Sequence, residues 1–194
     1  MNVNVLPRTR MNVDEFLAWS ARQPDDRYEL VDGKIIAMTR DSVRHNRTKF
    51  AAARALDDAV RAAGLPCSVF VDGVGVRINE RTLRIPDVMV HCGADPDPDA
   101  LIIESPLIVV EVVSPSSKGD DIETKVIDYF SVASIRHYLI IYSEQRVMIH
   151  HRRNDGDSID IRILRDGEIS LAPPGITVPV VALLGPSSVA GKAP

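Results

Sequence analysis

The chain has 194 residues, of which 45% are hydrophobic and 26% charged, a composition typical of one globular domain. No apolar run reaches the length of a membrane span, and the N-terminus lacks the layout of a signal peptide, so we expect a cytoplasmic protein. Cys67 and Cys92 show no metal-binding spacing, and we expect two reduced thiols. A net charge of -4 argues against non-specific coating of nucleic acid, because phosphate neutralisation needs lysine and arginine.

The first third of the chain predicts a helix, a hairpin and a longer helix. The segment 11–23 begins with capping-box spacing and carries apolar residues, which indicates a short helix. Asp32-Gly33 lies between two β-prone runs and is a strong hairpin signal. The stretch 42–64 is rich in alanine and arginine and lacks proline, so we expect one long helix that Ser42 caps.

The rest of the chain predicts strands, polar turns and one more helix. We expect a mixed sheet flanked by helices, an α/β (α+β) fold, in a single domain at 1–185 followed by a disordered tail at 186–194. The expected elements are two or three strands within 67–91, a loop at 94–100, a strand at 106–114, a helix at 119–133, a strand pair within 136–153, and a second pair around an Asp-Gly-Glu turn within 157–171.

Glu111 lies in the middle of "PLIVVEVVS", a run that is apolar on both faces and typical of a central sheet strand. A buried carboxylate without partners costs several kcal/mol or becomes neutral, so Glu111 needs a cation or hydrogen-bond donors. Lys125 lies on the shoulder of the apolar stripe of the next helix, and its long stem can bring the ammonium to Glu111. Asp87 follows a proline in another apolar strand and reaches the same face if the two strands are neighbours.

These three side chains suit two kinds of site. Two carboxylates held close together repel each other unless a cation lies between them, and a hard ion such as Mg²⁺ binds carboxylates, carbonyl oxygens and substrate phosphate. A lysine beside that pair can orient or deprotonate a water, which suits hydrolysis of a phosphodiester. The alternative is a buried ion pair of Glu111 and Lys125, with Asp87 capping a strand end.

The motifs "YELVDGKII", His45 on a helix, "PDVMV" and "PLIVVEVVSPSS…D…K…Y…RHYLIIY", in this order, resemble the Uma2 family (DUF820) of restriction-endonuclease-like proteins. That family belongs to the PD-(D/E)XK nuclease superfamily, and the resemblance covers about residues 12–150. It implies a restriction-endonuclease-like core with Asp87 and Glu111 as metal ligands and the backbone carbonyl of Val112 as a further one.

The resemblance also assigns a lysine and a second glutamate. The general superfamily pattern has Glu-x-Lys on the strand, but Val113 occupies that third place, and the Uma2 pattern carries its lysine on the next helix, at Lys125. Glu29 matches a further acidic position, although a hairpin residue that faces solvent is an equal alternative. His45 and Lys49 point to the packed side of the long helix, so His45 either supports the site near the phosphate or is a satisfied core histidine.

An arginine stripe follows another face of the long helix, around Phe50. Three interpretations are open: a track for nucleic-acid phosphates, a solvated face, or a contact between protomers. The acidic net charge of the chain favours the last two. The stripe consists of Arg44, Arg47, Arg54 and Arg61.

We therefore expect a Mg²⁺-dependent endodeoxyribonuclease, with Mn²⁺ as a substitute metal, that acts on DNA. Lys125 would position the attacking water or stabilise charge at phosphorus. A homodimer is expected, because two sites suit the cutting of two strands and most oligomers are two-fold dimers. The alternatives on the same fold are a catalytically inactive DNA- or partner-binding module and a scaffold in which the three side chains form only a buried network.

Overall fold

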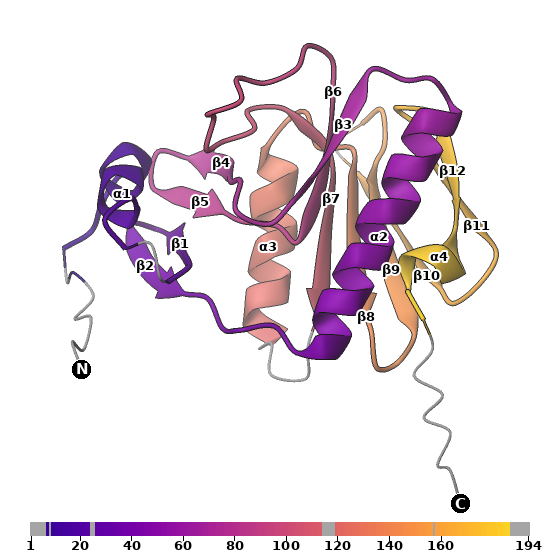
Figure 1. Ribbon diagram of the computed structural model, residues 1–194, viewed down its shortest axis with the longest axis horizontal. Helices are drawn as coiled ribbons and strands as arrows, with labels where there is room; N and C mark the ends of the chain where they lie inside the picture. Colours follow the sequence, from indigo (N-terminus) through magenta and orange to yellow (C-terminus); the bar gives the residue numbers. More distant parts are fainter. Residues whose placement is uncertain (1–6, 8, 24–25, 114–118, 157, 187–194) are drawn as a thin grey trace, which may run out of the picture.

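A six-stranded mixed sheet forms the centre of the protein in the computed structural model, which describes residues 7, 9–23, 26–113, 119–156 and 158–186 (Figure 1). Its strands are β3 (Cys67–Val71), β6 (Val88–Cys92), β7 (Pro106–Val113), β8 (His137–Tyr142), β9 (Val147–Arg153) and β10 (Ile159–Leu164). They lie in the order β10-β9-β8-β7-β6-β3, and only the β7–β8 pair is parallel. The predicted mixed sheet flanked by helices is confirmed.

The long helix α2 (Val43–Ala62) begins and ends where the sequence predicts. The Ser42 hydroxyl accepts a hydrogen bond from the backbone N–H of His45, which satisfies one of the free donors of the first turn. Gly64 follows the helix with a φ of 61°, a conformation that costs glycine little. The caps thus fix both ends of the helix that carries His45 and Lys49.

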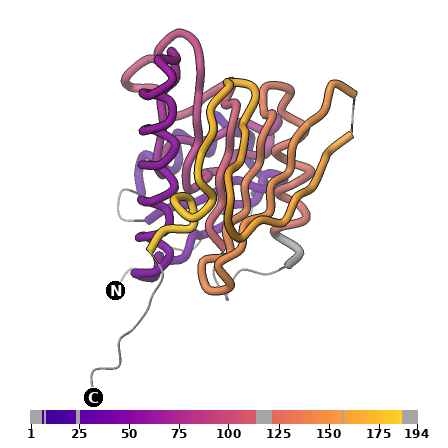
Figure 2. Tube along the Cα trace, turned by 90° about the vertical axis from the view of Figure 1, so that its right-hand side faces the viewer, coloured from indigo at the N-terminus to yellow at the C-terminus, as the bar shows by residue number. Residues whose placement is uncertain are grey.

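The helix α2 and the C-terminal segment cover one face of the central sheet. Alternate strand residues such as Val88, Val110 and Leu139 are fully buried there against Leu56 of α2. The rest of this face is covered by β11 (Glu168–Leu171), β12 (Ile176–Pro179) and α4 (Val180–Leu183), which lie over the strands in Figure 2.

The opposite face of the sheet packs against α3 (Gly119–Ser131), which connects the parallel strands β7 and β8. The residues between those of the first face, such as Met89 and Val109, point to this side and meet Tyr129 of α3. Because the side chains of a strand alternate between two covered faces, β7 is apolar at every position except Glu111. Glu111 lies on the α3 side of this strand, since it is two residues from Val109.

A smaller sheet extends the α3 side, with α1 (Val13–Ser20) packed on it (Figure 1). Its strand order is β2-β1-β5-β4, from β1 (Tyr28–Val31), β2 (Lys34–Ala37), β4 (Val76–Asn79) and β5 (Thr82–Arg84). The predicted capping box of α1 and the predicted hairpin at Asp32-Gly33 are both present. This sheet places β1 and β5 beside α3, and both strands contribute charged residues to the site described below.

Two pairings differ from the sequence prediction. The expected hairpin within 157–171 is wrong, because β10 pairs with β9 and β11 pairs with β12, so the Asp-Gly-Glu turn joins strands of different sheets. The expected reduced thiols are also wrong, because Cys67 and Cys92 are direct cross-strand neighbours on β3 and β6 and form a disulfide. Both errors concern contacts between separate strands, which local patterns do not encode.

The segment 67–91 also holds four strands, shared by two sheets, instead of two or three.

The predicted tail at 186–194 lies outside the described residues, apart from Pro186. Among the helices of the described part, none has the length and apolarity needed to cross a bilayer.

Candidate functional site

Asp87 and Glu111 meet where β6 begins and β7 ends. The pair Val88–Val110 is in register, so the antiparallel count places Asp87 opposite Glu111. The Asp87 carboxylate accepts a hydrogen bond from the backbone N–H of Val112, with Oδ2 2.7 Å from the nitrogen. This hydrogen bond extends the ladder by one residue before the start of β6 and holds the carboxylate against β7. The two strands are neighbours, as the shared face requires.

Two donors from α3 hold Glu111. Lys125 Nζ lies 3.0 Å from Glu111 Oε1, and the Tyr129 hydroxyl donates to the same oxygen at 2.7 Å. Lys125 and Tyr129 are four residues apart and therefore share one side of the helix. Glu111 Oε2 has no hydrogen-bond partner among the described residues. The buried acid is thus fixed through one oxygen and keeps the other available.

Glu29 joins this group from β1. It is only 5% exposed, so the alternative of a hairpin residue that faces solvent is wrong. Its carboxylate accepts hydrogen bonds from Arg84 at 3.1 Å and from the backbone N–H of Ile85 at 2.9 Å, and its Oε1 lies 3.8 Å from Lys125 Nζ. Arg84 also donates to Asp128 of α3 at 2.8 Å. We call this set the α3 network: Glu111, Lys125, Tyr129, Glu29, Arg84 and Asp128.

A second set of charges surrounds Asp87 from the other side. His45 Nε2 lies 3.0 Å from Asp87 Oδ1, and Lys49 Nζ lies 3.5 Å from the same oxygen. Lys49, which is almost fully buried, also pairs with Asp41 and lies 2.8 Å from Asp72 Oδ2. We call this set the α2 network: Asp87, His45, Lys49, Asp41 and Asp72. His45 thus lies against Asp87, one of the two predicted carboxylates of the site.

The two carboxylates titrate in opposite directions. Burial raises the pKa of Glu111 to about 7, since the charges of Asp87 and Glu29 add to it and the attraction of Lys125 only partly offsets it. Burial also acts on Asp87, but the hydrogen bond and charge of His45, the Val112 N–H and Lys49 outweigh it and lower its pKa. The pKa of His45 is in turn raised, because Asp87 outweighs the burial of the imidazole.

The donor atoms fit a hard divalent ion that is bound through two carboxylates. The free Oε2 of Glu111 and the remaining lone pairs of Asp87 are suitable ligands. The carbonyl of Val112 faces the same edge as its N–H, toward Asp87, because both groups of a strand residue point to one side. Within the described residues, no three His, Cys, Asp or Glu side chains form a complete metal site. Water and phosphate would thus complete the shell, as is usual for Mg²⁺.

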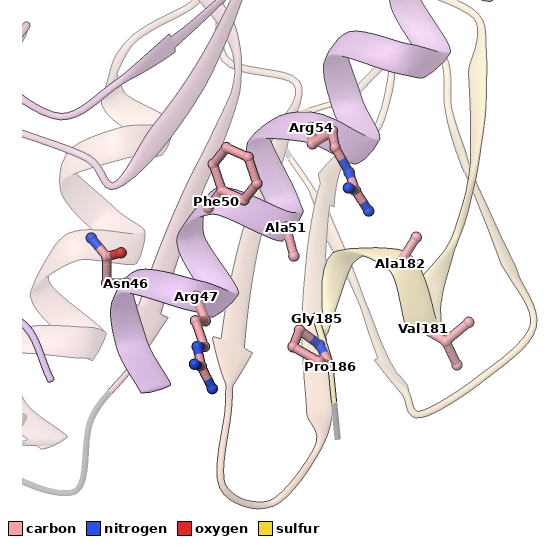
Figure 3. Close-up of a pocket in the computed structure, with 9 residues that line it drawn as sticks. All are labelled: Asn46, Arg47, Phe50, Ala51, Arg54, Val181, Ala182, Gly185 and Pro186. Atoms are coloured by element: carbon pink, nitrogen blue, oxygen red, sulfur yellow. The ribbon is translucent and has the colours of Figure 1, made fainter. Parts of the chain in front are cut away.

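The arginine stripe lies on the outer side of α2. Arg44 pairs with Glu144 and Arg61 with Asp57, whereas Arg47 and Arg54 have no ion-pair partner among the described residues. Phe50 stands between the last two and is 65% exposed (Figure 3). A groove of about 530 Å³ runs beside them, lined by Asn46, Arg47, Phe50, Ala51, Arg54, Val181, Ala182, Gly185 and Pro186.

Sequence reasoning did not single out Arg84, Asp128, Asp41, Asp72 or the hydroxyl of Tyr129. Arg84 lies in the apolar run "TLRIPD", so the reasoning that singled out Glu111 also applies to it. The aspartates stand in polar turns or on a helix surface, and no local signal distinguishes them from solvated residues. Their roles follow only from the tertiary contacts.

The chain is similar to known proteins over most of its length. The Uma2 family, described as "Putative restriction endonuclease", matches residues 13–181. Two relatives from Synechocystis sp. (strain ATCC 27184 / PCC 6803 / Kazusa) are each 27% identical: uncharacterized protein slr1290, over 90% of this chain and 91% of that protein, and uncharacterized protein sll1609, over 70% and 76%. A crystal structure described as a putative nuclease belonging to DUF820, from Anabaena variabilis ATCC 29413, shares the fold with a TM-score of 0.71 and 14% identity, over 90% of this chain and 97% of that one.

Proposed function

Since the chain belongs to the Uma2 family, described as "Putative restriction endonuclease", we propose that it is a Mg²⁺-dependent endonuclease that hydrolyses DNA phosphodiester bonds, with Mn²⁺ as a substitute. The observation that carries this proposal is the meeting of Asp87 and Glu111 at one strand end, with the Lys125 ammonium 3.0 Å from Glu111. A cytoplasmic homodimer belongs to the proposal, because two copies would present two sites to two strands.

Each side chain has a role that its contacts support. Asp87, Glu111 and the Val112 carbonyl would hold the ion, which when bound supplies Lewis acidity and a water of lowered pKa. Lys125 binds Oε1 of Glu111, next to the available Oε2, and is placed to orient the attacking water or to stabilise charge on the phosphate. Tyr129 fixes the Glu111 carboxylate, and His45 fixes Asp87.

Glu29 acts as a positioning residue in this proposal. Its carboxylate is held by Arg84 and by the backbone N–H of Ile85, and it lies 3.8 Å from the Lys125 ammonium. Lys125 therefore lies between two buried acids, Glu29 and Glu111, which hold its side chain in position.

The test is a nuclease assay on supercoiled, linear, single-stranded and branched DNA with Mg²⁺ or Mn²⁺. Glu111→Gln and Asp87→Asn should each lower the cleavage rate by at least about 100-fold, as expected for the loss of a charge that stabilises the transition state. Glu104→Gln is the matched control, because Glu104 is exposed and lies outside both networks. Equal rates for wild type and Glu111→Gln on every substrate would refute the catalytic proposal.

Metal binding separates this proposal from a purely structural network. Mg²⁺ or Mn²⁺ should raise the melting temperature of the wild type, because an ion that binds only the folded state stabilises it. The rise should disappear in Glu111→Gln and persist in Glu104→Gln. If no metal changes the melting temperature and isothermal titration detects no binding, Asp87, Glu111 and Lys125 form a scaffold network only.

A second candidate function is DNA binding without cleavage, which the groove beside α2 favours. Arg47, Arg54 and the exposed Phe50 line one groove of α2, a combination of cations and an aromatic ring that suits phosphates and a stacked base (Figure 3). In this case fluorescence anisotropy should detect salt-sensitive binding that Arg47→Ala and Arg54→Ala weaken and that Glu111→Gln leaves unchanged. Arg61→Ala is the control, because Arg61 already pairs with Asp57.

A further inference from the structure

The strand β10 is an open edge of the central sheet. It pairs with β9 over its whole length, from Ile159–Arg153 to Leu164–Met148, and with no other described strand. The four residues 160–163 are all exposed, with Ile161 at 61% and Ile163 at 69%. Natural sheets protect such edges with charges, prolines or a covering element, because unpaired backbone groups invite another strand. Here two exposed isoleucines alternate with Asp160 and Arg162 on the edge strand, and no other described strand pairs with it.

Apolar surface continues from this edge toward α3. Ile161 is paired with His151 and Ile163 with Ile149, so these side chains share one face of the sheet. Phe130 of α3 lies against His151, and Ile127, one turn earlier on the same side of the helix, is 73% exposed. An exposed apolar surface of this kind marks an interaction site.

We propose that two copies of the chain pair through β10, antiparallel and about a two-fold axis at Ile161. In this register Asp160 lies opposite Arg162 of the partner subunit, and Arg162 lies opposite Asp160 of the partner subunit. Ile159 lies opposite Ile163 of the partner subunit, on the face of the sheet that carries Ile161 and opposite to the face that carries the charged pairs. Two ion pairs and an apolar row thus form from one six-residue strand, and the two central sheets become one continuous sheet.

The charges of β10 select this register over its neighbours. An axis at Asp160 would set two aspartates opposite each other, and an axis at Arg162 would set two arginines opposite each other, both of which are repulsive. A two-fold axis that passes between two residues shifts the register by one residue. An isoleucine of one copy would then lie opposite a charged residue of the other, and these two side chains belong to different faces of the sheet. Parallel pairing in register would again oppose like charges. Asp160 and Arg162 have no ion-pair partner among the described side chains, so both remain available for the partner subunit.

This inference rests on the homodimer of the proposed function and does not depend on its chemistry. The experiment is sedimentation equilibrium over a concentration series, with thermal unfolding to show that each variant is folded. The wild type should be a dimer. Asp160→Arg and Arg162→Asp should each weaken it by at least about tenfold, because each sets like charges opposite each other twice. Ile161→Lys should have a similar effect, because it places two ammonium groups at the axis.

The double variant Asp160→Arg with Arg162→Asp is the decisive one. It exchanges the charges and restores both cross-strand pairs, so the dimer should recover. Asp58→Arg on the exposed side of α2 is the control for the charge change alone and should leave the dimer intact. A monomeric wild type, a dimer that Asp160→Arg does not weaken, or a double variant that stays monomeric would each overturn the proposal. Cleavage measured in parallel keeps this outcome separate, because Glu111→Gln should lose cleavage and remain a dimer.

Discussion

Asp87 and Glu111 are neighbours on adjacent strands and both are nearly buried, yet their pKa values move in opposite directions. Asp87 accepts a backbone N–H on one oxygen and faces a histidine and a lysine on the other. Glu111 receives both of its donors on one oxygen and has two further carboxylates nearby, Asp87 and Glu29. Burial is common to both, so the number and sign of the neighbouring charges decide the direction.

The networks around them also differ in their access to water. Arg84 and Glu29 of the α3 network have side chains that are 2% and 7% exposed. In the α2 network, the lysine is equally buried, but its partners Asp41 and Asp72 are 20% and 28% exposed. The second partner of Arg84, Asp128, is 17% exposed, so the carboxylate partners of Arg84 are on the whole less exposed than Asp41 and Asp72, and losing the cation should cost more in the α3 network.

The largest effect is expected from Arg84→Met. The substitution keeps much of the apolar stem and removes the guanidinium, which leaves Glu29 and Asp128 without their shared cation. The free energy of unfolding should fall by about 3–5 kcal/mol in urea denaturation. Arg77→Met is the matched control: Arg77 pairs with the largely exposed Asp14 and should cost less than about 1 kcal/mol. Equal losses would show that burial does not govern these pairs.

Lys49→Met applies the same change to the α2 network. We expect the free energy of unfolding to fall by about 2 kcal/mol, since the partly exposed Asp41 and Asp72 regain water when the ammonium is removed. The same urea series measures it. A loss as large as that of Arg84→Met would contradict the proposed difference in solvation between the two networks.

The buried pair His137 and His150 shows what burial does without a neighbouring acid. Their rings hydrogen-bond at 2.9 Å, and burial lowers the pKa of His137 to about 4 and that of His150 to about 3. Because these values lie below the ordinary 6.5, the unfolded chain binds protons first, and stability is lost as pH falls below about 6.5.

His150→Gln should remove part of this acid sensitivity. At pH 5 one such histidine costs about 2 kcal/mol, which corresponds to roughly 5 °C in melting temperature. The difference in melting temperature between wild type and variant should therefore shift by that amount in favour of the variant between pH 7.5 and pH 5. A constant difference across this range would mean that the pKa of His150 is the same in the folded and unfolded states.

The smallest effect is expected from Tyr129→Phe, which removes one of the two donors to Glu111. The free energy of unfolding, measured by urea denaturation, should fall by about 1–2 kcal/mol, because the Glu111 carboxylate keeps its contact with Lys125. Tyr142→Phe is the control, since its hydroxyl has no hydrogen-bond partner among the described residues, and it should change stability by less than about 0.5 kcal/mol. If both variants behave alike, the hydroxyl of Tyr129 does not hold the carboxylate.

The sequence by itself determined the local elements and the centre of the site. Capping residues fixed α1 and α2, the Asp32-Gly33 pair fixed a hairpin, and hydrophobic periodicity placed Glu111 in a buried strand with Lys125 on the helix that follows. These features were predictable because each depends on residues close together in the chain, where spacing alone sets geometry.

Only the tertiary structure decided which distant segments meet. The disulfide, the burial of Glu29 and the partners of Arg84 all join elements whose proximity depends on how the sheets assemble. Local patterns state that a residue is apolar or charged, but not which strand lies beside it. The charges around Asp87 and Glu111, and with them the opposite pKa shifts, follow from that assembly.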